Sequence, residues 1–171
     1  MARFRYLLDT ISEVLMWLAY AACILMMLHV ALDVLLRSPL FKISLYGTTE
    51  IVSAYYMIMI AFLPWAWVTR YNQHIAADIF TEMMPPRLRA WVAVLAQVLT
   101  IAFVALFAYQ TYFAAVKQTR GNESWLAGIY YLPVWPSRWL LPLAGGLMLL
   151  HLLTQLYMQL DEALRPRRRA Q

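Results

Sequence analysis

The sequence predicts an all-α membrane protein with four transmembrane helices and a short amphipathic interfacial helix after the second span. Of its 171 residues, 63% are hydrophobic and 13% are charged, whereas soluble domains contain roughly half apolar and about a quarter charged residues. Four segments also approach or exceed the roughly 20 residues that an apolar helix needs to cross a bilayer. These observations exclude a soluble enzyme, a disordered tail protein and a collagen-like chain.

The four predicted spans are apolar runs with almost no charged side chains. In a single integral membrane domain, 1–171, they cover residues 14–36, 51–68, 90–116 and 139–160. Asp33 is the one charged residue among them. The runs do not alternate and are longer than a barrel strand, and a helix satisfies its own backbone in lipid. The length of the first run and its retained Asp33 favour a membrane span over a cleaved signal peptide.

The basic residues predict the orientation of these spans. Nine of the fourteen lie on the side of both termini and the second loop: Arg3, Arg5, Arg70, Arg87, Arg89, Arg165, Arg167, Arg168 and Arg169. Cytoplasmic segments carry the excess of Lys and Arg, so both termini are expected to be cytoplasmic. The basic tail is interpreted as a topology anchor that can also contact anionic lipid headgroups. Net charge alone does not indicate a nucleic-acid partner.

The first and third loops carry polar and aromatic motifs on the opposite side. Thr48 or Thr49 is expected to cap the second span, which places Glu50 in its first turn, where the helix dipole favours an acid. The alternative is that Glu50 contacts a partner, a lipid or an ion. In the third loop, Trp135 lies between two prolines, which predicts an interfacial aromatic turn without regular helix, or a docking edge for another protein.

The second loop contains a polar stripe at helical spacing. Arg70, His74 and Asp78 are four residues apart, so on a helix they share one face. We expect an amphipathic interfacial helix at about residues 74–84, which ends at the following prolines. The stripe is interpreted as a docking surface or buried polar network, with a solvated face as the alternative. Two such groups are too few for a metal site.

Motifs for catalysis or ion translocation are missing. The sequence has no H-E-x-x-H, no G-x-S-x-G, no P-loop and no acid at the middle of a span. The remaining alternative is a membrane anchor subunit of a redox complex that binds haem or quinone, which would require two histidines at one depth. The predicted depths of His29 and His151 differ by roughly 9 Å, so His151 is expected to hydrogen-bond within the protein instead.

The order of the loop motifs resembles the small permease subunit of TRAP (tripartite ATP-independent periplasmic) transporters, the DctQ-like family. The resemblance covers nearly the whole chain. It rests on the four-span layout and on Gly47-Thr48-Thr49-Glu50, Arg70…His74-Ile75…Asp78 with Pro86-Arg87, and Gly121…Ser124 with Leu132-Pro133-x-Trp135.

The resemblance implies a non-catalytic subunit of the bacterial inner membrane. Such a subunit pairs with a large, sodium-coupled permease that holds the substrate and ion sites, and both work with a periplasmic substrate-binding protein on organic acids. The chain itself is expected to hold no cofactor, metal or substrate. Glu50, Arg70, His74, Asp78 and Trp135 then become candidates for subunit contact or structure. The chain also resembles the form in which the two membrane subunits are separate.

Overall fold

The fold is described by a computed structural model that covers residues 2–38, 42–43, 45–70 and 85–164. Its elements, in chain order, are α1 Ala2–Leu36, α2 Thr48–Ile51, η1 Val52–Tyr56, α3 Met57–Phe62, α4 Trp65–Arg70, α6 Pro86–Arg120, β1 Ser124–Ala127, β2 Tyr130–Pro133, α7 Trp135–Arg138 and α8 Leu140–Leu164. The predicted all-α membrane fold with four spans is confirmed, because four stretches are helical, long and apolar enough to cross a membrane.

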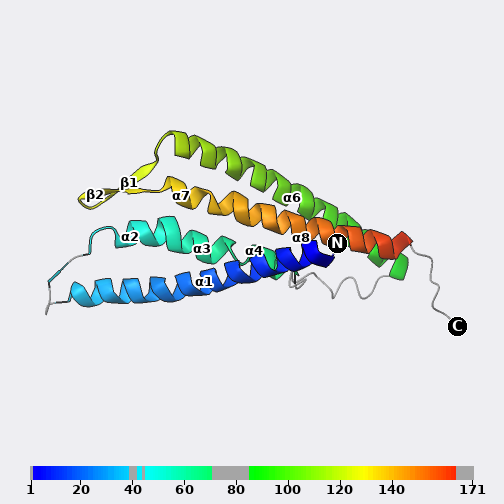
Figure 1. The fold of residues 1–171 in the computed structure, drawn as a ribbon, viewed down its shortest axis with the longest axis horizontal. Helices are drawn as coiled ribbons and strands as arrows, with labels where there is room; N and C mark the ends of the chain where they lie inside the picture. Colours follow the sequence, from blue (N-terminus) through cyan, green and yellow to red (C-terminus); the bar gives the residue numbers. More distant parts are fainter. Residues whose placement is uncertain (1, 39–41, 44, 71–84, 165–171) are drawn as a thin grey trace.

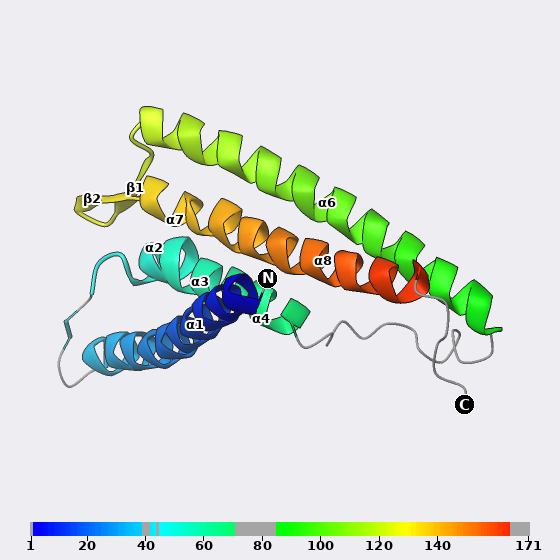
Figure 2. The ribbon, with the colours of Figure 1, turned by 45° about the vertical axis from the view of Figure 1, so that its right-hand side comes forward.

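The four spans lie side by side in one row (Figures 1 and 2). The α1 helix packs against α3 and α4, these pack against α8, and α8 packs most extensively against α6. Near its start, α1 also reaches α8 directly. The α1 and α6 helices therefore form the two edges of the row. The start of α1 and the end of α8 lie at the same end of the molecule, as an even number of spans requires (Figure 1).

The second span consists of short helical segments, and its regular α-helical geometry is interrupted at two places. A π-helical turn, η1, lies between α2 and α3, and Pro64 separates α3 from α4 because proline has no amide N–H to donate. A π turn inserts extra backbone and re-aims the side chains around it. Here the Tyr55 hydroxyl donates a hydrogen bond to the carbonyl oxygen of Pro133. The interruption thus joins the second span to the third loop.

The third loop contains a feature that the sequence analysis missed. Its strands β1 and β2 form an antiparallel hairpin in which Ala127 pairs with Tyr130. Gly128 is the first residue of the two-residue connection and has a φ of 68°, a conformation typical of glycine in tight hairpin turns. The expectation for Trp135 was also partly wrong, because α7 begins there and accommodates Pro136 in its first turn, where a missing N–H costs nothing.

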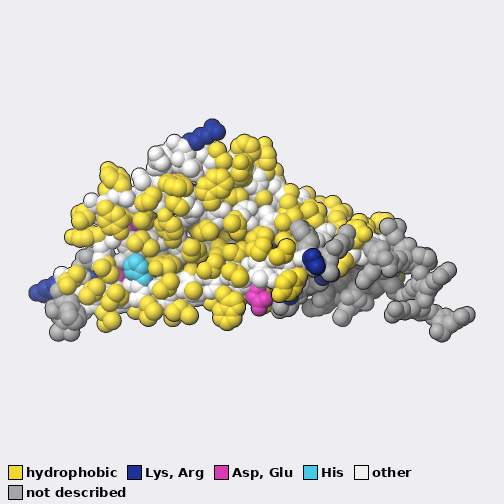
Figure 3. Space-filling view, in the orientation of Figure 1, with side chains coloured by type: hydrophobic (Ala, Val, Ile, Leu, Met, Phe, Trp, Pro, Cys, Tyr) yellow, Lys and Arg dark blue, Asp and Glu magenta, His cyan; other side chains and the backbone are white. Residues whose placement is uncertain are grey.

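Little of the molecule is buried. The largest core cluster consists of Val104, Met148 and Leu152, where α6 and α8 meet, and Trp65 packs against it. In the most apolar window of the third span only 6% of the residues are buried, and in the fourth span 28%. Hydrophobic side chains cover most of the face in Figure 3. The row therefore relies on lipid or on other proteins to cover its apolar surface.

Candidate functional site

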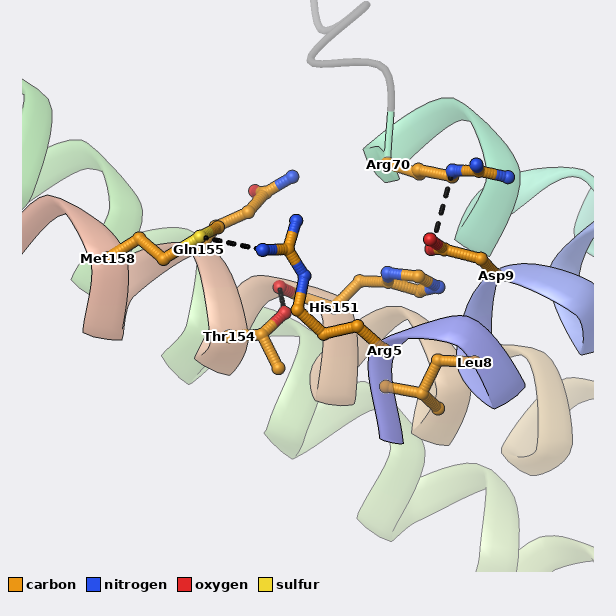
Figure 4. A pocket seen from close by; sticks show the side chains of 8 residues that line it. All are labelled: Arg5, Leu8, Asp9, Arg70, His151, Thr154, Gln155 and Met158. Carbon is orange, nitrogen blue, oxygen red and sulfur yellow. Dashed lines mark hydrogen bonds and ion pairs between the residues drawn. The ribbon is translucent and has the colours of Figure 1, made fainter. Parts of the chain in front are cut away.

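A polar pocket lies at the end of the row where α1 begins and α4 ends (Figure 4). Its volume is about 330 Å³. Three helices supply its lining, with Arg5, Leu8 and Asp9 from α1, Arg70 from α4, and His151, Thr154, Gln155 and Met158 from α8. The Arg5 side chain extends over α8 toward Met158, while Arg70 and Asp9 face each other across the opening (Figure 4). The pocket thus brings together charged groups that are far apart in the sequence.

Among the described residues, Arg70 is the predicted site residue that lines this pocket. Its Nε atom lies 3.3 Å from Oδ1 of Asp9, and about a third of each side chain is exposed. The pair connects the end of the second span to the beginning of the first. Sequence reasoning missed Asp9 because its spacing from Arg70 carries no periodic signal; an acid just before an apolar run was the only indication.

Below this pair, Ser12 and His151 form a buried hydrogen bond between α1 and α8. The Ser12 Oγ atom lies 2.8 Å from His151 Nε2, and it also bonds the Leu8 carbonyl oxygen at 2.8 Å. A hydroxyl has one proton, and the carbonyl can only accept it. We therefore assign Nε2–H of His151 as the donor to Ser12. The expected hydrogen bond of His151 within the protein is confirmed.

Two glutamines extend this network across the row. Gln155 donates to the Thr69 carbonyl oxygen at 2.6 Å, which joins α8 to α4. Gln97 donates to the Leu152 carbonyl oxygen at 3.2 Å, which joins α6 to α8. Polar groups in lipid hold helices together because they lack water as a partner. These contacts indicate a role in helix association.

The arrangement of the histidines disfavours the haem alternative. His29 packs edge-on against Tyr56, with 6.0 Å between the ring centres. It lies 17 residues after Ser12, the partner of His151, which is about 25 Å along α1. One iron cannot bind both rings, and Nε2 of His151 is already hydrogen-bonded. Among the described residues, no three His, Cys, Asp or Glu side chains cluster as a metal site would require.

At the opposite end, Glu50 lies in the first turn of α2, as predicted, and its side chain is half-buried. The expected threonine cap is wrong. Gly47 precedes the helix with a φ of 87°, and no side chain caps it. Thr48 instead donates its hydroxyl back to the Leu45 carbonyl oxygen at 3.4 Å. A glycine is needed here because a Cβ atom would collide with the Tyr130 hydroxyl.

The same end contains an ion pair that holds the hairpin against the fourth span. Arg138 bonds both carboxylate oxygens of Glu123, at 2.9 and 3.1 Å. This hydrogen bonding holds the pKa of the Glu123 carboxyl below its usual value, against the opposing effect of desolvation. The Glu123 carbonyl oxygen also accepts from the amide of Val134 at 2.8 Å and weakly from that of Trp135. Trp135 is therefore fixed at the start of α7.

Several predicted features lie outside the described residues. They are His74, Asp78, the interfacial helix at about 74–84, and the tail residues Arg165, Arg167, Arg168 and Arg169. These expectations remain predictions.

The comparisons with known proteins settle the family. Residues 26–162 match the family model described as Tripartite ATP-independent periplasmic transporters, DctQ component. The chain belongs to the DctQ family. This DctQ component is therefore the small membrane subunit of a TRAP transporter and a multi-pass membrane protein. A search of curated proteins gave no match.

The two edges of the DctQ row are candidate contact surfaces. Leu25 and Leu28 on α1 are more than half exposed, as are Leu99, Phe103 and Leu106 on α6. A lone apolar side chain at the surface is normal, but continuous apolar edges of this length indicate contact with lipid or with a membrane protein. A family that forms one part of a tripartite transporter has both kinds of neighbour.

Proposed function

We propose that this DctQ subunit pairs with a large, sodium-coupled permease subunit and stabilises it in the inner membrane. The complex takes up organic acids delivered by a periplasmic substrate-binding protein, and both termini of the chain are cytoplasmic. The observation that carries the proposal is the single row of helices with two uncovered apolar edges. A subunit of this shape can extend along the side of a larger membrane protein.

The polar groups inside the spans support a structural role. His151 is bonded to Ser12, and Gln155 to the backbone of Thr69. Asp33 forms an ion pair with Arg37, one turn away on the same helix, at 3.0 Å. A translocation path needs polar groups that can exchange partners with ions or substrate. Here these groups are used to join helices or to end them, so the substrate and sodium sites belong to the partner.

The proposed contact residues lie at the two ends of the row. Glu50 and Trp135 are half-buried at the hairpin end, where the large subunit or the binding protein can reach them. Arg70 lies at the opposite end, and we expect His74 and Asp78 to continue the same contact surface. Their role is assembly, and substitutions there are expected to leave substrate affinity unchanged.

A pull-down of the tagged chain from its native membrane in mild detergent tests the proposal. We expect a larger multispan protein to copurify, without a haem absorption band. Arg70→Ala or Asp78→Ala should lower the recovered partner about fivefold, the effect of losing roughly 1 kcal/mol of contact energy. Arg3→Ala, which removes a cation from the exposed start of α1, is the matched control.

Three results would overturn the proposal. They are a haem band or redox subunits in the eluate, transport by the purified chain alone after reconstitution, and a change of substrate preference in the Arg70 variant with the complex intact. The first would revive the redox-anchor alternative. The second and third would place transport chemistry in this chain.

A further inference from the structure

The described residues that line the polar pocket of Figure 4 include two cationic side chains and one anionic side chain. Arg5 and Arg70 are the cations and Asp9 is the anion, so these described side chains carry one net positive charge with His151 neutral. The Asp9 carboxylate bonds Arg70. The contact of the Arg5 guanidinium with a described residue is a 3.2 Å approach of Nη1 to the sulfur of Met158. A thioether is a weak acceptor, and a guanidinium has five N–H donors.

The pocket also lies at the level of a membrane surface. Arg5 precedes the uncharged apolar run of the first span, Arg70 follows that of the second, and Met158 lies near the end of that of the fourth. These three residues come from three different helices, and all three line the pocket. The pocket therefore opens where the hydrocarbon gives way to headgroups, at the depth of the phosphate groups of one leaflet.

We propose that this pocket binds the phosphate group of an anionic membrane phospholipid. Arg5 and Arg70 hold the phosphate oxygens, because guanidinium groups match phosphate geometry and bond it through paired N–H donors. The leaflet is the cytoplasmic one if the proposed orientation holds, while the ligand chemistry does not depend on that orientation.

The size and lining of the pocket fit such a headgroup. A volume of about 330 Å³ is at the small end of ligand pockets and accommodates a phosphodiester with part of its glycerol. Leu8 and Met158 supply apolar contact for the glycerol and the first acyl carbons. Choline on a zwitterionic lipid would meet the net positive charge, so the pocket should prefer a headgroup without an ammonium group, such as phosphatidylglycerol.

Native mass spectrometry of the full chain, released from phosphatidylcholine nanodiscs that contain some phosphatidylglycerol, tests this proposal. We expect the chain to retain phosphatidylglycerol in preference to phosphatidylcholine. Arg5→Gln should lower that occupancy about tenfold, as expected for the loss of a charge-assisted hydrogen bond. Arg3→Gln removes the same charge from the same helix outside the pocket and should leave occupancy unchanged. Arg5→Lys, which keeps the charge, should restore part of it and show that the variant folds.

Equal occupancy in the Arg5 and Arg3 glutamine variants would overturn the proposal, because retention would then reflect general surface charge. Displacement of the lipid by excess inorganic phosphate or by a dicarboxylate would also overturn it, since the pocket would then bind a soluble anion. The test uses the chain without its permease partner, so its outcome is independent of whether the proposed pairing is correct.

Discussion

The buried hydrogen bond between Ser12 and His151 shows how single side chains connect the spans. Both residues are almost inaccessible, at 0% and 5% exposure. The Ser12 hydroxyl serves two partners at once, its own helix through Leu8 and the neighbouring helix through His151. In lipid no water replaces a lost partner, so the bond should matter more to the packing of α1 on α8 than its single contact suggests.

Ser12→Ala should therefore destabilise the protein by about 0.5–2 kcal/mol, the range measured for hydrogen bonds between membrane helices. Unfolding of the purified protein in mixed micelles provides the measurement. Ser53→Ala is the matched control, because the Ser53 hydroxyl bonds only carbonyl oxygens of its own helix. Equal effects of the two substitutions would show that the link to His151 contributes nothing.

The ion pair of Glu123 predicts a pH dependence. Because Arg138 lowers the pKa of this carboxyl in the folded protein, the pair stabilises the fold at pH values above the unfolded pKa of about 4.3. This contribution should disappear as the pH falls through the folded pKa. We expect wild type to exceed Glu123→Gln in unfolding midpoint at about pH 7, and the difference to shrink as the pH falls below the unfolded pKa and through the lower, folded one. A difference that persists at the acid limit would contradict the assignment.

At the scale of elements, two glycines differ in whether the fold requires them. Glycine is required at one position by the backbone conformation, whereas at the other it only lowers helix propensity. Gly47 has a φ of 87° and no room for a Cβ beside Tyr130 and Ala127. Gly146 lies inside α8, and apart from its chain neighbours and the adjacent backbone of the helix no atom lies within 4 Å of the position that its Cβ would take. The same substitution should therefore have opposite consequences at the two positions.

Gly47→Ala should destabilise the fold by more than about 1 kcal/mol, through left-handed strain and displacement of the hairpin. Gly146→Ala should stabilise it by about 0.5–1 kcal/mol, since alanine is the better helix former. Unfolding midpoints of the two variants provide the comparison. A stable Gly47→Ala protein would mean that the hairpin does not depend on the first loop.

These elements also show what the sequence can predict. Long apolar runs indicated the four helices because, in lipid, a helix satisfies its own backbone hydrogen-bonding groups. The hairpin was missed because four-residue strands carry almost no periodic signal, although Gly128 between aromatic and branched residues is a turn signal. The Asp9–Arg70 pair was missed because it depends on how two distant helix ends meet. Local sequence rules predict the elements, whereas the contacts between elements are known only once the fold is known.

At the scale of the whole molecule, the row has two edges that cannot have the same neighbour in a one-to-one complex. A large partner that joins one edge leaves the other to lipid. Leu25 on α1 and Leu99 on α6 are suitable reporters, because both are exposed and distant from the polar pocket and the hairpin.

With Cys23 replaced by serine, a single cysteine is placed at Leu25 or at Leu99, and the complex is treated with a bifunctional thiol-to-amine reagent or a photoreactive thiol probe. We expect an adduct with the large subunit from one position and lipid or probe hydrolysis products from the other. Adducts from neither position, with the complex intact by pull-down, would show that the partner joins a flat face of the row.

The one-layer arrangement also has a mechanical consequence. Four helices at spacings of about 8–10 Å place the outer axes roughly 25–30 Å apart. Viscous drag on rotation about the membrane normal grows with the square of an object's width, so a plate turns more slowly than a compact bundle of the same mass. Attached along one edge to a larger membrane protein, such a flat subunit would increase the width of the complex. It would therefore slow the rotation of the whole complex about the membrane normal.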